Sequence, residues 1–300
     1  MPFVGEIAAL VSALTWGLTT VVVRAESRRL DVLLHNALRS SFGSVYTLAL
    51  LGGLAVLGLH TPRLGGDWLL GVTLLILSVV LMVGGGDSLY FLAVARIGVA
   101  RAMPVSMSFP LITTILAVAL LGERISAGLV AGLVLIPVGL YLVTLPARGR
   151  VVFPKSEPRT LWVGLGLALI AATLWAISSV IVRPALDQVD VLSATGIRSL
   201  GGAGSVWVLV WGSGRLAART RLTRTRLGVA ALGGLLNTSG SLLFIYAIQQ
   251  AGAARTATLT ATAPLFALPL SVLWLDEQVT RRQVAGTVLV VAGLMLVVGF

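Results

Sequence analysis

Thr15-Trp16-Gly17-Leu18-Thr19-Thr20-Val21-Val22-Val23-Arg24 occurs twice in this chain, since its pattern returns 159 residues later as Leu174-Trp175-Ala176-Ile177-Ser178-Ser179-Val180-Ile181-Val182-Arg183. Each copy places a tryptophan and hydroxyl groups inside an apolar run that ends in an arginine. The same offset extends without a gap and relates Asp31 to Asp190, Arg39 to Arg198, Ser40 to Ser199 and Gly43 to Gly202. The sequence therefore predicts two structurally related halves.

Apolar residues dominate the composition. Of the 300 residues, 57% are hydrophobic and 11% are charged, and the mean hydropathy is +1.00. Soluble domains carry roughly 25% charged residues, and about 20 mainly apolar residues span a bilayer. The composition predicts an integral membrane protein and excludes a soluble globular domain, whose surface would be almost entirely apolar.

The formal net charge of +11 is a membrane signal here. The arginines lie mainly in short connectors, where such residues set orientation and meet lipid headgroups. No basic run interleaves with aromatic residues, so we predict no nucleic-acid partner. The chain has no cysteine and two histidines, and so offers no recognisable metal cluster. Residues 7–23 lack a basic leader and a cleavage motif and are predicted to be a retained span.

Ten apolar spans are predicted, at approximately residues 5–24, 32–58, 68–95, 99–121, 126–145, 160–182, 191–213, 227–249, 253–275 and 281–299. A polar linker at residues 148–159, which contains Pro154 and Pro158, separates a first repeat of five helices (1–147) from a second (160–300). The predicted fold class is an all-α membrane protein, with ten transmembrane helices arranged as two inverted five-helix repeats.

The inversion follows from the number of spans in each half. The later part of each half repeats at an offset of 154, which relates Gly98 to Gly252, Arg101 to Arg255, Pro110 to Pro264, Glu123 to Glu277, Gly132 to Gly286 and Gly139 to Gly293. Because five is odd, the two halves must cross the membrane in opposite senses. Inverted repeats of this kind are found in secondary transporters, with the substrate site near the middle of the membrane.

Charge placement supports this topology. Of the 22 lysines and arginines, Arg39 and Arg198 lie inside spans, and the other 20 divide sixteen to four between the two sides. The predicted topology puts both termini on the same side, which the positive-inside rule places outside the cytoplasm.

Several motifs resemble the EamA-type family of the drug/metabolite transporter superfamily. They are the Trp-Gly pair in the first span, Arg39-Ser40 in the second, and Pro110 followed by Leu121-Gly122-Glu123-Arg124 in the fourth. Leu275-Asp276-Glu277-Gln278 is a looser copy of the last motif. The resemblance covers essentially the whole chain. It implies that both termini lie in the cytoplasm, opposite to the charge count, so the absolute orientation stays open.

Arg39 and Arg198 are the first candidates for a substrate cavity. A charged side chain inside a span costs at least about 2.5–3.5 kcal/mol, so it normally faces the bundle interior or a wet cavity. His35 lies one helical turn before Arg39 on the same face. These arginines would either attract carboxylate or phosphate groups of a substrate, or extend toward the interface and bond neighbouring carbonyls.

Asp87 follows three glycines and is the acid placed deepest within a span. It is a candidate for proton coupling, because an acid in such a setting exchanges protons when its pKa is raised. The alternative is a permanently ionised, structural partner of Arg39 or Arg101. Its repeat mate is Ser241, so any coupling would be asymmetric.

Trp16 and Trp175 lie about ten residues into their spans, with the hydroxyls of Thr15, Thr19 and Ser178 nearby. Such an aromatic and hydroxyl surface would line a cavity and stack on flat or cationic substrates, or serve helix packing alone. The remaining predicted cavity residues are Tyr90, Ser108, Asn237, Ser241, Thr258 and Thr262. Hinge or kink candidates, whose missing N–H groups free backbone carbonyls, are Pro104, Pro110, Pro264 and Pro269.

The function predicted from these features is secondary-active transport, most simply export, of small metabolites, amino acids or amphipathic compounds by alternating access. Alternatives are a carrier of nucleotide sugars or phosphate esters, a lipid flippase, and an accessory membrane scaffold. An enzyme is not predicted, because the sequence contains no Walker loop, nucleophile elbow or paired carboxylates. We expect a multi-pass protein of the cell membrane, monomeric or homodimeric, with no cofactor or metal and with lipids and a small molecule as its partners.

Overall fold

The computed structural model describes residues 3–26, 32–97, 102, 105–106, 108–144, 158–213, 223–263, 265–266 and 281–299. These residues are helical apart from turns, connectors and an isolated bridge between Leu64 and Val189. The helices are α1 (Val4–Glu26), α2 (Val32–Val56), α3 (Trp68–Val79), the π-helix η1 (Val80–Asp87), α4 (Ser88–Ile97), α6 (Phe109–Leu121), α7 (Ala127–Thr144), α8 (Pro158–Ala185), α9 (Val191–Gly212), α10 (Arg224–Ala251), α11 (Ala253–Thr260) and α13 (Arg281–Gly299). The all-helical prediction is confirmed.

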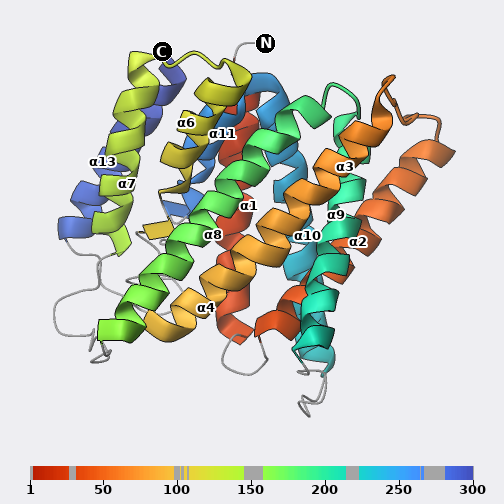
Figure 1. The fold of residues 1–300 in the computed structure, drawn as a ribbon, viewed down its shortest axis with the longest axis horizontal. Helices are drawn as coiled ribbons and strands as arrows, with labels where there is room; N and C mark the ends of the chain where they lie inside the picture. The colour runs from red at the N-terminus through yellow and green to blue at the C-terminus, as the bar shows by residue number, and fades with distance from the viewer. Residues whose placement is uncertain are drawn as a thin grey trace.

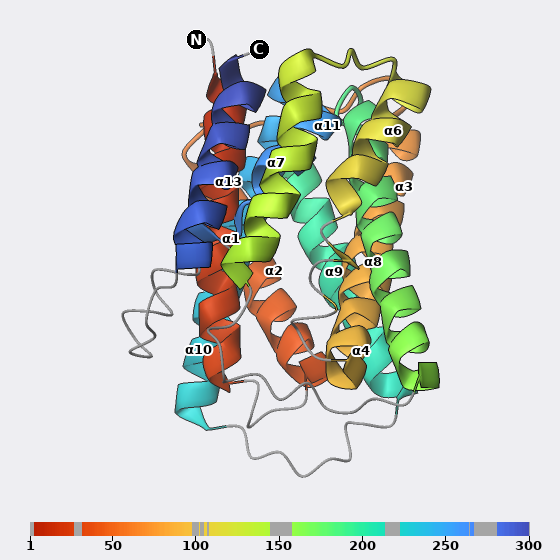
Figure 2. The same ribbon diagram turned by 90° about the vertical axis from the view of Figure 1, so that its left-hand side faces the viewer.

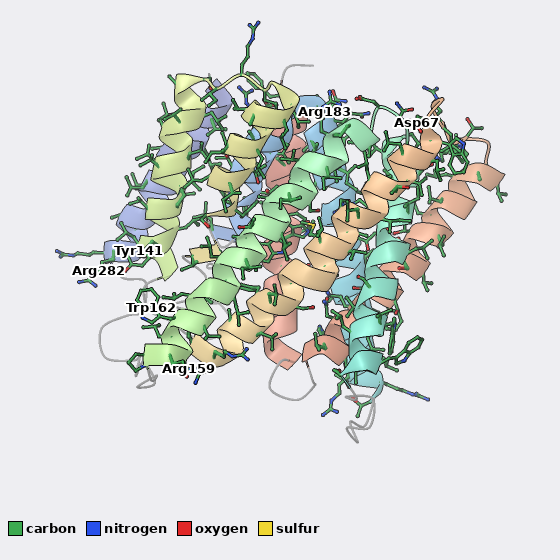
Figure 3. The ribbon with its side chains drawn as sticks, viewed as in Figure 1. Asp67, Tyr141, Arg159, Trp162, Arg183 and Arg282 are labelled. Atoms are coloured by element: carbon green, nitrogen blue, oxygen red, sulfur yellow. The ribbon has the colours of Figure 1, made fainter. Side chains whose placement is uncertain are left out.

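Corresponding helices of the two halves run in opposite directions through one bundle. α1 begins at the end of the bundle where the chain termini lie, whereas α8, its repeat mate, ends there (Figures 1 and 2). Figure 3 marks the two ends: Asp67 and Arg183 lie at the termini end, and Arg159 lies at the opposite end.

The most extensive packing joins helices of different halves. α1 packs on α10, and its mate α8 packs on the continuous rod of α3, η1 and α4. α2 packs on α9, α6 on α11, and α7 on α13. The helices of the two halves are therefore interleaved, so that no half buries its own apolar faces alone.

Glycines allow the close approach of α7 and α13, which lie side by side at one edge of the bundle (Figures 1 and 2). A Cβ atom on Gly139 would lie 2.6 Å from the carbonyl oxygen of Gly286, and one on Gly132 would lie 3.2 Å from that of Gly293. These four glycines are the two pairs that the offset of 154 relates. The repeat thus conserves a contact between the fifth helices of the two halves.

The outer surface is apolar, as a lipid environment requires. Large hydrophobic side chains point outward, among them Ile115 at 67% exposure and Met295 at 70%. Within the described residues, three helices are long and apolar enough to cross a membrane: Trp68–Tyr90, Pro158–Ala185 and Arg224–Ala251. Shorter apolar helical stretches are Val4–Thr19, Phe109–Leu121, Ala127–Leu142 and Val284–Val297.

The fourth and ninth predicted spans include residues outside the described part of the chain. Ala102, Val105 and Ser106 are helical, and α6 begins at Phe109, with Pro110 in its first turn. Proline is tolerated there because its missing N–H would have no helical partner, so Pro110 starts a helix rather than kinking one. α11 ends at Thr260, residues 261–262 form a turn, and Ala263, Leu265 and Phe266 are again helical. The kink candidates Pro104, Pro264 and Pro269 lie outside the described residues.

Candidate functional site

The two repeated tryptophans pack against glycines of the opposite half. Trp16 of α1 lies on Gly240 of α10, where a Cβ atom would come within 2.7 Å of the indole Nε1. Trp175 of α8 lies on Gly86 of η1, where the corresponding distance is 2.6 Å. Gly86 and Gly240 are themselves related by the offset of 154. Both tryptophans therefore point into the bundle, and each marks a point where the halves cross.

A charged cluster lies beside one of these crossings. Arg39 Nη2 lies 3.8 Å from Asp87 Oδ2, and the indole of Trp175 donates a 3.1 Å hydrogen bond to Asp87 Oδ1. Arg39 also donates to Asn237 Oδ1 at 2.7 Å and to Asn36 Oδ1 at 2.6 Å. The cluster joins α2, η1, α8 and α10, and so ties together both halves.

Aromatic rings cover this cluster. The ring centroid of Tyr90 lies 5.4 Å from that of Trp175, and Phe109 meets the same indole edge-on at 6.1 Å. At the other crossing, Trp16 packs on Phe244 with centroids 5.1 Å apart. The surface around Asp87 thus combines one carboxylate with three aromatic rings, two of which, those of Tyr90 and Trp175, belong to predicted cavity residues.

Arg198 is buried more deeply and has different partners. Only 3% of the residue is exposed. Its Nη1 donates to the hydroxyl of Ser78, and its Nη2 approaches Met82 Sδ at 3.2 Å. These partners lie on α3 and η1 of the first half, just as Arg39 reaches Asn237 in the second half. The two arginines therefore make repeat-related, crossed contacts.

Comparison with known proteins identifies the fold. The EamA-like transporter family matches residues 3–145 and 162–299. The chain belongs to the EamA-like transporter family. The predicted resemblance to this family of the drug/metabolite transporter superfamily is therefore confirmed.

Two similar proteins extend over nearly the whole EamA-like chain. An uncharacterized transporter of Archaeoglobus fulgidus is 25% identical over 292 residues, which cover 96% of this chain and 95% of that protein. A protein of known crystal structure superposes with a TM-score of 0.77 at 18% identity, covering 99% of this chain and 96% of that one. The second likeness concerns the fold alone. Together with the apolar helices, the family indicates a helical membrane transporter.

The predicted hydroxyl groups of this EamA-like transporter mostly bond the backbone of their own helices. Such internal bonds are typical of Ser and Thr in membrane helices. Each hydroxyl donates to a carbonyl three or four residues earlier at 2.6–2.9 Å in Thr15, Thr19, Ser108, Thr258 and Thr262. Ser178 is fully buried, and its hydroxyl has no hydrogen-bond partner within the described residues.

The remaining predicted residues lie at or near the crossings. His35 is buried on α2, one turn before Arg39. Asn237 bonds Arg39, whereas Ser241 is half-buried on α10 at the position equivalent to Asp87. Sequence reasoning missed Asn36, although its spacing of three residues from Arg39 places both on one helical face. It also missed Ser78 and Met82, because nothing in the sequence pairs α9 with α3 and η1.

A cavity of about 250 Å³ lies between α2, α9 and α10. Leucines and the hydroxyl groups of Thr47, Thr195, Thr238 and Ser239 line it, and none of the predicted cavity residues is among its lining residues.

The termini end of the bundle is held together by charged groups. The carboxylate of Glu123 accepts hydrogen bonds from the backbone N–H groups of Ala253, at 2.7 Å, and Ala254, at 3.1 Å, at the start of α11. Arg255 forms a 2.7 Å ion pair with Glu6 of α1. Glu123, from the motif that ends the fourth span, therefore fastens the end of α6 to α11, and Arg255 fastens α11 to α1.

Proposed function

We propose that this EamA-like protein is a secondary-active transporter of small metabolites, amino acids or amphipathic compounds, working by alternating access. In this proposal ten transmembrane helices form two inverted five-helix repeats, residues 1–147 and 160–300, joined by the linker 148–159. The observation that carries the proposal is the cluster of Arg39, Asp87, Trp175 and Asn237, which lies where helices of both halves meet, with Arg39 buried and the other three half-buried. Ionised groups at such a depth are expensive and mark substrate or ion pathways.

The contacts at the termini end support a two-state mechanism. Glu123, Glu6 and Arg255 hold α6, α11 and α1 together at that end. We take the described structure as the state closed at the termini end, in which a substrate reaches the cluster from the opposite end. Rocking of one half against the other about the crossings would exchange the two states.

Asp87 is the group we assign to proton coupling. Its carboxylate is held by Arg39 and Trp175, and each contact depends on negative charge or on a free acceptor oxygen. A proton on Asp87 would remove the attraction to Arg39 and loosen α2 from η1. Proton binding and helix movement would thereby be linked.

The remaining elements of the proposal follow from topology and composition. We assign the protein to the cell membrane, with both termini on the same side, with lipids and a small molecule as partners, and without a cofactor. We assign export as the direction of transport, and a monomer or homodimer as the working form.

Transport is tested with purified protein in two steps. A thermal-shift screen against metabolite pools identifies ligands, because a compound that binds the folded state raises its apparent stability. Each ligand is then assayed for flux in proteoliposomes with an imposed pH gradient. We expect gradient-dependent flux in the wild type and gradient-independent, slower flux in Asp87→Asn. If no stabilising ligand is transported, the proposed function is wrong. If Asp87→Asn keeps the full pH dependence of flux, only the assignment of proton coupling to Asp87 is wrong.

A further inference from the structure

The two repeat-related arginines differ in how fully hydrogen-bond acceptors and counter-charges compensate their positive charges. Both Nη atoms of Arg39 donate to amide oxygens, and Asp87 lies 3.8 Å away. Arg198 has a serine hydroxyl on Nη1 and a thioether sulfur on Nη2. Within the part of the chain that the structure describes, its Nε has no hydrogen-bond partner and no carboxylate forms an ion pair with it.

This difference leaves one edge of the Arg198 guanidinium without a strong hydrogen-bond acceptor. Nε–H and one N–H of Nη2 point the same way, and together they form the fork that binds a carboxylate or phosphate through two parallel hydrogen bonds. Nε is unbonded, and a thioether is only a weak acceptor. Arginine stays charged in proteins, so a buried guanidinium in this state lacks both a counter-charge and strong acceptors.

We propose that Arg198 is the anion-binding residue of the transport pathway, and that a carboxylate or other oxyanion of the substrate docks on its Nε–Nη2 edge and displaces Met82. This inference rests on the proposed transport function and narrows its substrates to compounds with a negatively charged oxygen group. Ser78 stays on Nη1 and holds the guanidinium in place while the anion binds.

The position of Met82 links this site to the charged cluster. Met82 and Asp87 both belong to η1, whose glycines, Gly84 to Gly86, lie between them. Met is flexible and readily repacks, and π-helical segments are often found at functional sites. Movement of Met82 on anion binding would therefore act on the same segment that carries the partner of Arg39.

The test uses benzoate as an anionic probe and benzamide as its neutral, nearly isosteric counterpart. Wild-type protein in phosphatidylcholine nanodiscs is melted with each compound at matched ionic strength. We expect benzoate but not benzamide to raise the melting temperature. In Arg198→Gln, benzoate affinity should fall about tenfold or more, since charge-assisted hydrogen bonds are the strong ones. Arg198→Lys keeps the charge without the fork and should fall in between.

Two variants separate anion binding from a structural role. Arg183→Gln removes an exposed arginine that lies outside the cluster and should keep the benzoate shift. Met82→Leu removes the competing sulfur and should increase the benzoate shift, so it tests the site even where Arg198→Gln does not fold. An unchanged benzoate shift in Arg198→Gln, a smaller one in Met82→Leu, or none in the wild type would overturn the proposal.

A lipid headgroup is the other source of an oxyanion. The same melts in phosphatidylglycerol nanodiscs distinguish it: a stabilisation by the lipid that needs Arg198 and abolishes the benzoate shift would overturn the substrate assignment. Transport itself is judged separately. If the protein transports only neutral or cationic compounds, and Arg198→Gln does not change this flux, the transport function stands and the anion site is wrong. If benzoate binds through Arg198 but no compound is transported, the anion site stands and the transport function is wrong.

Discussion

Asp87 and Ser241 occupy equivalent positions in the two halves, and only one of them carries charge. Asp87 offsets the charge of Arg39, whereas its equivalent in the second half is the half-buried, uncharged Ser241. Among the residues that the structure describes, the charges of Arg39, Arg198 and an ionised Asp87 therefore sum to one positive charge. This imbalance is the residue-scale reason to expect different roles for the two arginines.

The coupling of Arg39 to Asp87 is measurable with a double-mutant cycle. Removing either partner leaves a buried charge unpaired, so Arg39→Gln and Asp87→Asn should each destabilise the protein by about 3 kcal/mol. The double variant should lose less than the sum, by about 1–3 kcal/mol. Denaturation in detergent micelles measures the four free energies of unfolding.

Arg183 provides the matched control for this cycle. It pairs with Asp187 at 3.3 Å, but their side chains are 36% and 65% exposed. Because solvent screens such pairs, Arg183→Gln should cost under about 0.5 kcal/mol. Additive effects of Arg39→Gln and Asp87→Asn would mean that the two side chains do not interact energetically.

The sequence predicted the members of the charged cluster better than their pairing. It offered Asp87 two partners, Arg39 and Arg101; the structure places Arg39 3.8 Å away, and Arg101 lies outside the described residues. Charge inside an apolar run is visible in a sequence because it is costly there. Which side chains meet depends on helix rotation and packing, and so Asn36, Ser78 and Met82 appeared only in the structure.

At the scale of elements, Glu123 acts as a cap supplied by another helix. The first amides of a helix have no internal partners, and the Glu123 carboxylate supplies acceptors for two of them in α11. Glu123→Ala should cost about 1 kcal/mol and speed hydrogen exchange at Ala253 and Ala254. Exchange in the pair of α7 and α13 should not change, and Arg124→Ala, the exposed neighbour, should have no effect. Unaltered protection of both amides in Glu123→Ala would show that the cap contributes nothing.

Asp190, the N-cap of α9, makes the stability of the fold depend on pH in the acidic range. Partial burial raises its pKa, but hydrogen bonds from Ser193 and Arg63 and the nearby His60 outweigh this and hold the pKa below its usual value. The pKa of Asp190 is therefore lower in the folded protein than in the unfolded chain, where it is about 3.9. The ionised carboxylate stabilises the fold above about pH 3.9, and this stabilisation is lost as the pH falls through the pKa of the folded state. Melting temperatures from pH 7 to pH 3 should fall more steeply in the wild type than in Asp190→Asn, which keeps the cap. Parallel curves would contradict this.

Most helices lie within a few residues of the predicted spans, because apolar runs separated by polar connectors define membrane helices directly. The predicted span 68–95 corresponds to α3, η1 and α4, but its π-helical centre was not predicted. Three successive glycines, Gly84 to Gly86, permit close packing or a break in the helix. The helix widens into a π-helix here, and this depends on the neighbouring helices. Ser205 lies against Gly84, Leu174 against Gly85 and Trp175 against Gly86.

At the scale of the whole molecule, the absence of cysteine allows a direct test of topology. Gly66, beside Asp67, has open space around it, and Arg159 lies at the opposite end of the bundle. In intact cells an impermeant maleimide should label only one of Gly66→Cys and Arg159→Cys, and both after permeabilisation. Labelling of Gly66→Cys alone places the termini outside, as the charge count predicts; labelling of Arg159→Cys alone places them in the cytoplasm. Labelling of both in intact cells contradicts ten spans.

The crossed packing of α1 on α10 and of α8 on η1 bears on how such a chain arises. Two separate copies of an ancestral half, inserted in opposite orientations, would make both tryptophan contacts at once as a symmetric dimer. Gene duplication and fusion then adds no new contact, but it allows the two halves to differ in sequence. A symmetric ancestor carries two acids at the crossings or none; only a fused descendant can hold a single carboxylate, at Asp87, and leave its twin a serine.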